Sequence, residues 1–182
     1  MSLFDYSNVE EFKEKSGYVI DGKFYPRVTK ILEIKSKPAL YWFYGEASSY
    51  KAAKAITDIS AKEGTLVHEV VEKLMVGEKP EIPKAIEPAV RGFQEFFADA
   101  KIDIRPEFVE KRIFHPEHRY AGTIDTLATI DGKFGVLDIK TSQGIYRDYN
   151  LQTSAYVEAL LKEFPNIETR WILRIDKIHT CL

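Results

Sequence analysis

Two aspartates and a lysine flank a predicted tight turn at positions where their side chains can meet. Asp131-Gly132 separates two apolar, β-branched segments, and this dipeptide favours a type I′ turn, which needs positive φ at both central residues. Counting outward from such a turn puts Asp125 opposite Asp138 in an antiparallel ladder. Lys140 follows two residues after Asp138 and therefore projects from the same face. The sequence thus predicts two carboxylates and an ammonium group at one place.

Two carboxylates at this separation repel each other. The cost is about 4 kcal/mol at about 4 Å with an effective dielectric constant of about 20, and opposed like charges destabilise a sheet. A divalent cation removes that cost, and hard oxygen ligands suit Mg²⁺ or Mn²⁺. The alternative is a pair of exposed aspartates on a solvated face. The apolar runs 127–130 and 134–139 favour a buried strand pair and hence one or two bound ions.

Four short elements follow one another along the chain: Gly64-Thr-Leu-Val-His68, Gly122-Thr-Ile-Asp125, Asp138-Ile-Lys140-Thr141 and Gln152-x-x-x-Tyr156. In this order they resemble the motifs of the PD-(D/E)XK nucleases, in particular the RecB-like exonucleases of phage and archaeal type. The resemblance extends from about Tyr25 to Lys177. Ile124 replaces the proline of the named motif, but the RecB-like branch usually has G-x-x-D at that place.

The resemblance implies a set of metal ligands. In that branch the side chains of His68, Asp125 and Asp138 and the backbone carbonyl of Ile139 bind the metal. Glu110 resembles the acidic residue that the branch often carries on the strand before G-x-x-D. Taken alone, His68 lies near the apolar stripe of its helix and is explained as a hydrogen-bonded core histidine, and Glu110 as the partner of a neighbouring basic side chain. Both alternatives remain open at this point.

Three further residues complete the expected catalytic set. Lys140, beside the metal, would orient or deprotonate the attacking water or stabilise developing charge. Gln152 and Tyr156 are four residues apart and so share one flank of a helix, where the family places them. For this pair the alternative is ordinary surface polarity.

Composition limits the class of protein. The chain has 182 residues, a hydrophobic content of 45%, a charged content of 30% and a net charge of −2, which together are typical of a globular protein without bulk attraction to nucleic acid. Its single cysteine, Cys181, excludes a four-cysteine iron–sulfur cluster. We find no signal-peptide pattern or long apolar run and therefore expect a cytoplasmic protein without membrane contact. The resemblance to exonucleases of phage and archaeal type implies a viral or prokaryotic origin.

The periodicity of apolar residues predicts the fold class. We expect one domain over 1–182, with a mainly helical part at 1–105 and a sheet core at 106–177. Helices are expected at 9–15, 58–77, 83–100 and 148–164, and strands at 107–114, in the hairpin 120–140 and at 168–177. The last strand should lie parallel to 134–140. The result is an α/β fold with a central mixed sheet flanked by helices, as in the restriction-endonuclease-like core that the resemblance implies.

Two groups of side chains outside these motifs have chemical potential. Tyr41, Trp42, Phe43 and Tyr44 cover every face of a helix, so some should be buried and others exposed, where a ring can stack on an unpaired base. A core role is the more common one for any single ring. His115 and His118 have usable metal-ligand spacing, but their place in a polar turn favours solvated loop histidines.

The sequence therefore predicts a metal-dependent DNA nuclease, an exonuclease that acts on single strands or DNA ends, with a helicase or recombination protein as a conceivable partner. One alternative is a structure-selective endonuclease on the same fold, which would be a dimer with a basic face. The other is a nucleic-acid-binding module that does not cut.

Overall fold

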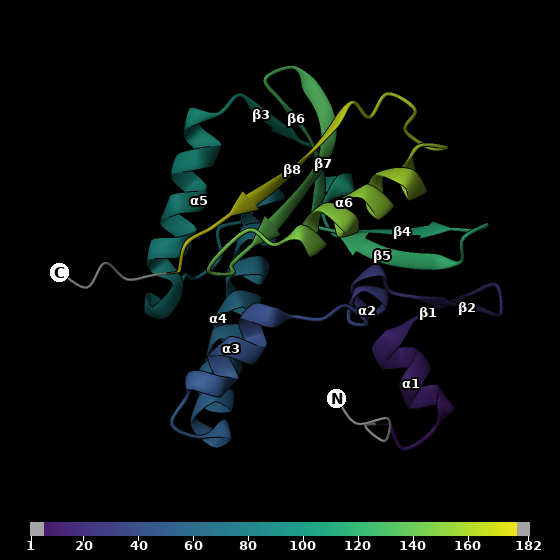
Figure 1. The fold of residues 1–182 in the computed structure, drawn as a ribbon. Coiled ribbons are helices and arrows are strands. Elements are labelled where there is room, and N and C mark those ends of the chain that lie inside the picture. Colours follow the sequence, from purple (N-terminus) through teal and green to yellow (C-terminus); the bar gives the residue numbers. More distant parts are fainter. Residues whose placement is uncertain (1–5, 178–182) are drawn as a thin grey trace.

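The computed structural model describes residues 6–177 (Figure 1). Cys181 lies outside this range. The helices are α1 (Val9–Ser16), α2 (Val28–Leu32), α3 (Pro38–Glu46), α4 (Tyr50–Met75), α5 (Glu87–Asp99) and α6 (Arg147–Leu160), with short 3₁₀ turns η1 (Lys84–Ile86) and η2 (Pro106–Phe108). The strands are β1 (Gly17–Ile20), β2 (Lys23–Pro26), β3 (Ile102–Ile104), β4 (Lys111–His115), β5 (Tyr120–Ile124), β6 (Thr126–Ile130), β7 (Lys133–Lys140) and β8 (Thr169–Arg174).

A four-stranded mixed sheet in the order β3-β6-β7-β8 lies at the centre of the fold. Its antiparallel hairpin β6–β7 turns at Asp131-Gly132, where both residues have positive φ, 51° and 80°. Ile130 pairs with Lys133, and the register continues unbroken to Thr126 opposite Leu137. The predicted two-residue turn is therefore confirmed, and so is its register from Ile130 to Thr126. The ladder ends there, so Asp125 does not pair with Asp138 in it as predicted but lies at the bend between β5 and β6.

The last strand is also placed as predicted. β8 pairs parallel with β7 along six residues, and the connection between them contains α6. A parallel pair needs such a crossover, because a short turn cannot bring the chain back to the same end of the sheet. Strand β3, which pairs antiparallel with β6, was not predicted, since its three residues are too short to give a periodic pattern.

The strand expected at 107–114 is wrong in its first half and in its sheet. Residues 106–108 form the turn η2, and Glu110 has φ of 51°, so the strand β4 begins only at Lys111. Together β4 and β5 form a separate two-stranded ribbon, and Asp125, between β5 and β6, marks the break between the two sheets. Glu110 therefore does not share a strand face with Arg112. Its position is fixed by its backbone N–H, which donates to the carbonyl of Asp125 at 3.0 Å.

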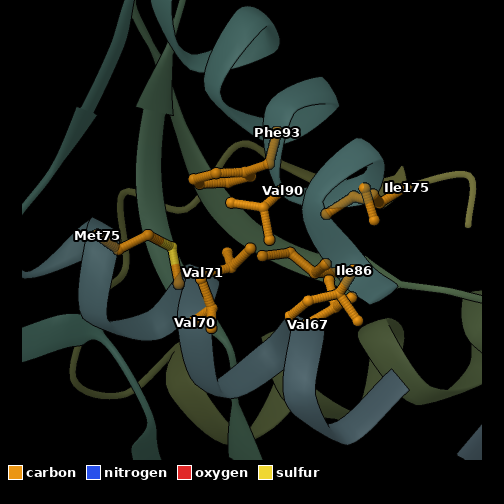
Figure 2. Close-up of a cluster of buried hydrophobic side chains, with 10 residues drawn as sticks. Val67, Val70, Val71, Met75, Ile86, Val90, Phe93 and Ile175 are labelled. Atoms are coloured by element: carbon orange, nitrogen blue, oxygen red, sulfur yellow. The ribbon is translucent and has the colours of Figure 1, made fainter. Parts of the chain in front are cut away.

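Helices cover both faces of the central sheet (Figure 1). On one face, α4 and α5 bury a cluster that includes Val67, Val71 and Phe93 against Ile139 of β7 (Figure 2). On the other face, α6 buries Tyr156 and Leu160 against strands β5, β6 and β7. Alternation along β7 gives Ile139 to the first face and leaves Asp138 and Lys140 on the second.

The segment 38–59 differs from the expectation. Helix α4 starts at Tyr50 rather than at 58, and its first half extends with α3 away from the sheet (Figure 1). Within the part of the chain that the structure describes, no residue of α3 is buried. The four aromatic residues therefore do not belong to the core. Their rings instead remain at the surface.

His115 also corrects a prediction. It belongs to strand β4, and its imidazole is buried and stacked on that of His118, with ring centroids 4.5 Å apart. Its Nδ1 accepts a hydrogen bond from the backbone N–H of His118. The pair is a structural turn rather than two solvated histidines, although His118 is exposed as expected.

Within residues 6–177 no helix combines the length and the apolar character that crossing a bilayer requires.

Two glycines allow a test of the β7–β8 packing. A Cβ added at Gly135 would lie 2.1 Å from the backbone carbonyl oxygen of Thr169 on β8, whereas one at Gly92, inside α5, meets nothing within 4 Å. We expect Gly135→Ala to lower the free energy of unfolding by at least about 2 kcal/mol through overpacking. Gly92→Ala should raise it by about 0.5–1 kcal/mol, the gain in helix propensity. Urea denaturation of both variants tests this packing, and a stable Gly135→Ala variant would contradict it.

Candidate active site

Asp125 lies at the bend between β5 and β6, close to the C-terminal end of β7. Its Oδ2 accepts a hydrogen bond of 2.5 Å from the backbone N–H of Ile139, and its Oδ1 lies 3.6 Å from Nδ1 of His68 on α4. The structure therefore brings three of the predicted site residues together. Because Asp125 approaches the strand residue next to Asp138, the two aspartates lie at the same end of the sheet.

Asp138 is the most enclosed acidic side chain of the site, with 2% of its surface exposed. Its Oδ1 accepts a hydrogen bond of 3.2 Å from Nε2 of Gln152 on α6. Nζ of Lys140 lies 2.6 Å from its Oδ2, but the approach is poorly directed, so that this buried oxygen has an ion-pair partner and no hydrogen-bond donor. Asp138, Lys140 and Gln152 thus form one buried polar group, as the motif order predicted.

Tyr156 completes this group through a close packing contact. Its hydroxyl oxygen accepts a second hydrogen bond, 2.9 Å long, from Nε2 of Gln152. A Cβ at Gly122 would stand 2.6 Å from Cε1 of the tyrosine ring. The glycine of the G-x-x-D element therefore lets α6 approach β5, and that approach delivers Gln152 to Asp138.

A second acidic group lies beside Asp125 and includes a residue that the sequence analysis missed. Glu72 is four residues after His68 on α4 and so shares its helix face. Its carboxyl and that of Glu110 share a hydrogen bond, and both feel the negative charge of Asp125. Partial desolvation and these like charges raise the pKa of Glu72, and raise that of Glu110 to about 7 although Glu110 remains exposed as a residue. The i, i+4 spacing after His68 was the available signal.

For Asp138 and His68, burial and neighbouring opposite charges shift the pKa in opposite directions. Desolvation raises the pKa of Asp138 to about 6, and the charge of Asp125 adds to it, while Lys140 opposes the shift. Burial is the larger cause of this shift in the pKa of Asp138, and the repulsion between the two aspartates is the smaller one. For His68, burial favours the neutral imidazole, but the hydrogen-bonding interaction with Asp125 and the charge of that carboxylate together outweigh burial and raise the pKa.

An open cleft of about 550 Å³ lies next to these residues, between α4, the end of β7 and the start of α6. Its lining is rich in hydroxyls and amines, and the described residues that form it include no carboxylate: Thr57, Ser60, Ala61, Gly64, Thr65, His68, Lys140, Thr141, Ser142, Tyr149 and Lys177. Lys140 lies 5.1 Å from the centre of the Tyr149 ring, which closes one side. Such a lining suits an anionic ligand with many acceptor oxygens.

Gly64 shapes the floor of this cleft. A Cβ there would lie 2.8 Å from Oγ1 of Thr141, the residue after Lys140, so the glycine allows α4 to pack directly on the end of β7. Lys177 reaches the same helix and donates from Nζ to the carbonyl and the hydroxyl of Ser60, at 2.7 and 2.8 Å. The close contact at Gly64 is thus with a side chain and not with the backbone.

The donor set has the chemistry of a magnesium or manganese site, since carboxylates, a backbone carbonyl and an imidazole surround the end of β7. The unsatisfied Oδ2 of Asp138 is an available ligand atom. Among the described residues, however, no three His, Cys, Asp or Glu side chains are placed to hold one ion together. Lys140 and the N–H of Ile139 already contact the two aspartates, so coordination would require small side-chain rotations.

Comparison with known proteins does not classify the chain. No protein-family model matches the sequence, and no curated protein matches it significantly.

The buried carboxylate predicts a pH-dependent stability. With a pKa of about 6 in the folded state against an ordinary 3.8, Asp138 makes the folded protein bind a proton more tightly, so stability should fall as pH rises from about 4 to 6. Asp138→Asn removes this cost and keeps an acceptor for Gln152. We expect it to raise the free energy of unfolding in EDTA by about 1–3 kcal/mol at pH 7.5, and by little at pH 4.

Asp131→Asn is the matched control, because it sits at the exposed hairpin turn, where asparagine also tolerates positive φ. It should change stability by less than about 0.5 kcal/mol at either pH. A larger gain for Asp138→Asn at pH 4 than at pH 7.5 would contradict the assignment of a raised pKa.

Proposed function

We propose that this protein is a metal-dependent deoxyribonuclease that hydrolyses phosphodiester bonds, acting as an exonuclease on single strands or DNA ends. The observation that carries the proposal is the convergence of Asp125, Asp138 and Lys140 with Gln152 and His68 at one end of β7. These residues come from β7, α4, α6 and the β5–β6 bend, and structural stability alone does not require them to meet.

The cleft supports this reaction because its chemistry fits a phosphate chain. Hydroxyls of Ser60 and Thr141 can donate to phosphate oxygens, and the ammonium groups of Lys140 and Lys177 balance their charge. The described residues of the lining include no carboxylate, so the nearest like charges are those of the two aspartates behind Lys140, which the proposed ion would neutralise. A scissile phosphate at Lys140 would lie directly beside the two aspartates.

The protein groups have distinct tasks in this proposal. Asp125, Asp138, His68 and the carbonyl of Ile139 would hold Mg²⁺ or Mn²⁺, with Glu110 as a further acidic ligand. Such an ion lowers the pKa of bound water and neutralises charge on the transferring phosphate. Lys140 leaves its ion pair with Asp138 to orient the attacking water or to stabilise charge on the phosphate. Gln152, held by Tyr156, keeps Asp138 in position.

A PD-(D/E)XK assignment, with its restriction-endonuclease-like core, belongs to the same proposal. Supporting it are the four motif elements in order, the mixed sheet β3-β6-β7-β8 and the helices on its two faces. The spatial arrangement of the four motif elements is stronger support than their residue types, since each element contributes at least one side chain to the same site.

The experiment that tests the function is cleavage of end-labelled DNA. Single and double strands labelled at the 5′ or the 3′ end are incubated with Mg²⁺ or Mn²⁺, and products are resolved by length. Stepwise shortening from one end supports an exonuclease, and internal cuts at branched DNA support the endonuclease alternative. Binding of DNA without cleavage at any Mn²⁺ concentration would refute the nuclease and support the alternative of a nucleic-acid-binding module that does not cut.

The two central residues should be essential for cleavage. We expect Asp138→Ala and Lys140→Ala each to lower the cleavage rate by at least about a hundredfold, the scale of losing a positioned charge. Lys133→Ala, at the exposed opposite end of β7, is the control and should cut like the wild type. Thermal melting checks that the variants fold. Near-normal cleavage by either variant would refute the site.

A substitution at His68 tests whether this residue is a metal ligand or a core histidine. If it binds the metal, His68→Ala should raise the Mn²⁺ concentration for half-maximal cleavage by about tenfold or more, the scale of losing metal-site support, with a small change in melting temperature. His118→Ala removes an exposed imidazole elsewhere and should leave the metal dependence unchanged. A collapse of stability with unaltered metal dependence would assign His68 to the core.

A further inference from the structure

The aromatic side chains of α3 and the start of α4 have no structural role as core. Tyr41 is 63% exposed and Tyr50 69% exposed, and α3 buries no residue against the described part of the chain. The helix packs against α4, whose first half itself projects from the sheet (Figure 1). Large aromatic surfaces left in water are costly, so an exposed group of them indicates a binding surface.

These tyrosines form a row that continues the cleft of the candidate active site. The hydroxyl of Tyr44 lies 3.5 Å from Oγ1 of Thr57, which lines the cleft at its outer end. The rings of Tyr44 and Tyr50 are stacked, with centroids 5.5 Å apart and planes inclined by 24°. Tyr41 is one turn before Tyr44 and therefore lies on the same face of α3.

Trp42 is not part of this row, although it is 71% exposed. It lies two residues from Tyr44, and at about 100° per residue it points from nearly the opposite face of the helix. The row is thus defined by geometry and not merely by aromatic composition, and Trp42 is a matched residue on the same helix.

The distance from Thr57, which contacts the row, to His68 at the site is that of a short stretch of nucleic acid. Thr57 and His68 both line the cleft and are separated along α4 by about three turns, or about 16 Å at a rise of about 1.5 Å per residue. At the stacked spacing of about 3.4 Å per nucleotide this corresponds to about five nucleotides. A single strand with its scissile phosphate at Lys140 therefore reaches the tyrosines with the bases beyond that length.

We propose that Tyr41, Tyr44 and Tyr50 form a stacking platform for the unpaired bases of a DNA single strand whose scissile phosphate lies at Lys140. This inference rests on the proposed function and specifies its substrate as an unpaired tail longer than about five nucleotides. Stacking on aromatic rings tolerates any base, which fits an enzyme that must process arbitrary sequence. Hydroxyl and lysine side chains along the cleft contact the backbone, and the platform contacts the bases.

The test measures binding without cleavage. Fluorescein-labelled oligothymidines of four and fifteen nucleotides are titrated with protein in EDTA, and affinity is read from anisotropy. We expect Tyr41→Ala and Tyr50→Ala each to weaken binding of the 15-mer by about fivefold to a hundredfold, the contribution of one stacked ring. Binding of the 4-mer should stay within about twofold of wild type. Tyr41→Phe keeps the ring and should retain the affinity.

Controls assign the effect to this row. Trp42→Ala, on the opposite face of α3, and Phe97→Ala, on α5, should leave the 15-mer affinity unchanged. An equal loss for Trp42→Ala overturns the platform, as does unchanged affinity of the tyrosine variants or no measurable binding of the 15-mer by the wild type. A wild-type dimer that Tyr41→Ala splits, with DNA affinity unaltered, would make the row an interface between copies of the chain and overturn the proposal.

Binding and cleavage can fail separately. If the wild type binds the 15-mer through Tyr41 and Tyr50 but does not cut it with Mn²⁺, the platform stands and the nuclease proposal fails. If the wild type cuts but the tyrosine variants bind and cut equally well, the nuclease stands and the platform fails.

Discussion

The burial of the Asp138 carboxylate at the C-terminal end of β7 is the constraint on which the site depends. Taking this charge out of water raises its pKa to about 6, and the fold compensates only in part, with one amide donor from Gln152 and a poorly directed ammonium group from Lys140. A structure selected for stability alone would place an apolar residue there. Apart from the ion pair with Lys140, Oδ2 of Asp138 has no hydrogen-bond partner in the described part of the chain.

Two glycines make this arrangement possible, because each lets a helix approach the sheet more closely than a side chain would allow. Gly122 receives the ring of Tyr156 and so positions Gln152, and Gly64 receives Thr141 and so positions His68 above Asp125. A Cβ at either position would push α6 or α4 outward. The glycines of the motifs thus work through packing, although neither has a positive φ.

The sequence predicted those parts of the fold in which local and global signals agree. The turn at Asp131-Gly132, its register as far as Thr126 and the parallel strand β8 follow from turn chemistry and alternation, and all three are confirmed. The predicted ladder pair of Asp125 with Asp138 is not formed, because the chain bends at Asp125 to change sheets. Glu110 was placed on a strand because its neighbours alternate, but the chain turns there to leave one sheet for the other, which alternation cannot reveal. Glu72 was missed because its role depends on where α4 crosses the sheet. The metal ligands remain a prediction.

The distribution of charge explains how a chain with a net charge of −2 can suit a polyanion. Asp125, Glu72 and Glu110 gather beside the end of β7, while the cleft beside them is lined by hydroxyls and lysines without a carboxylate. Screening limits exposed charges to about 10 Å at ordinary ionic strength, so a phosphate in the cleft responds to its own lining more than to the total charge. A divalent ion among the acidic groups would also reverse their local sign. The net charge of the chain therefore argues neither for nor against a polyanionic ligand in the cleft.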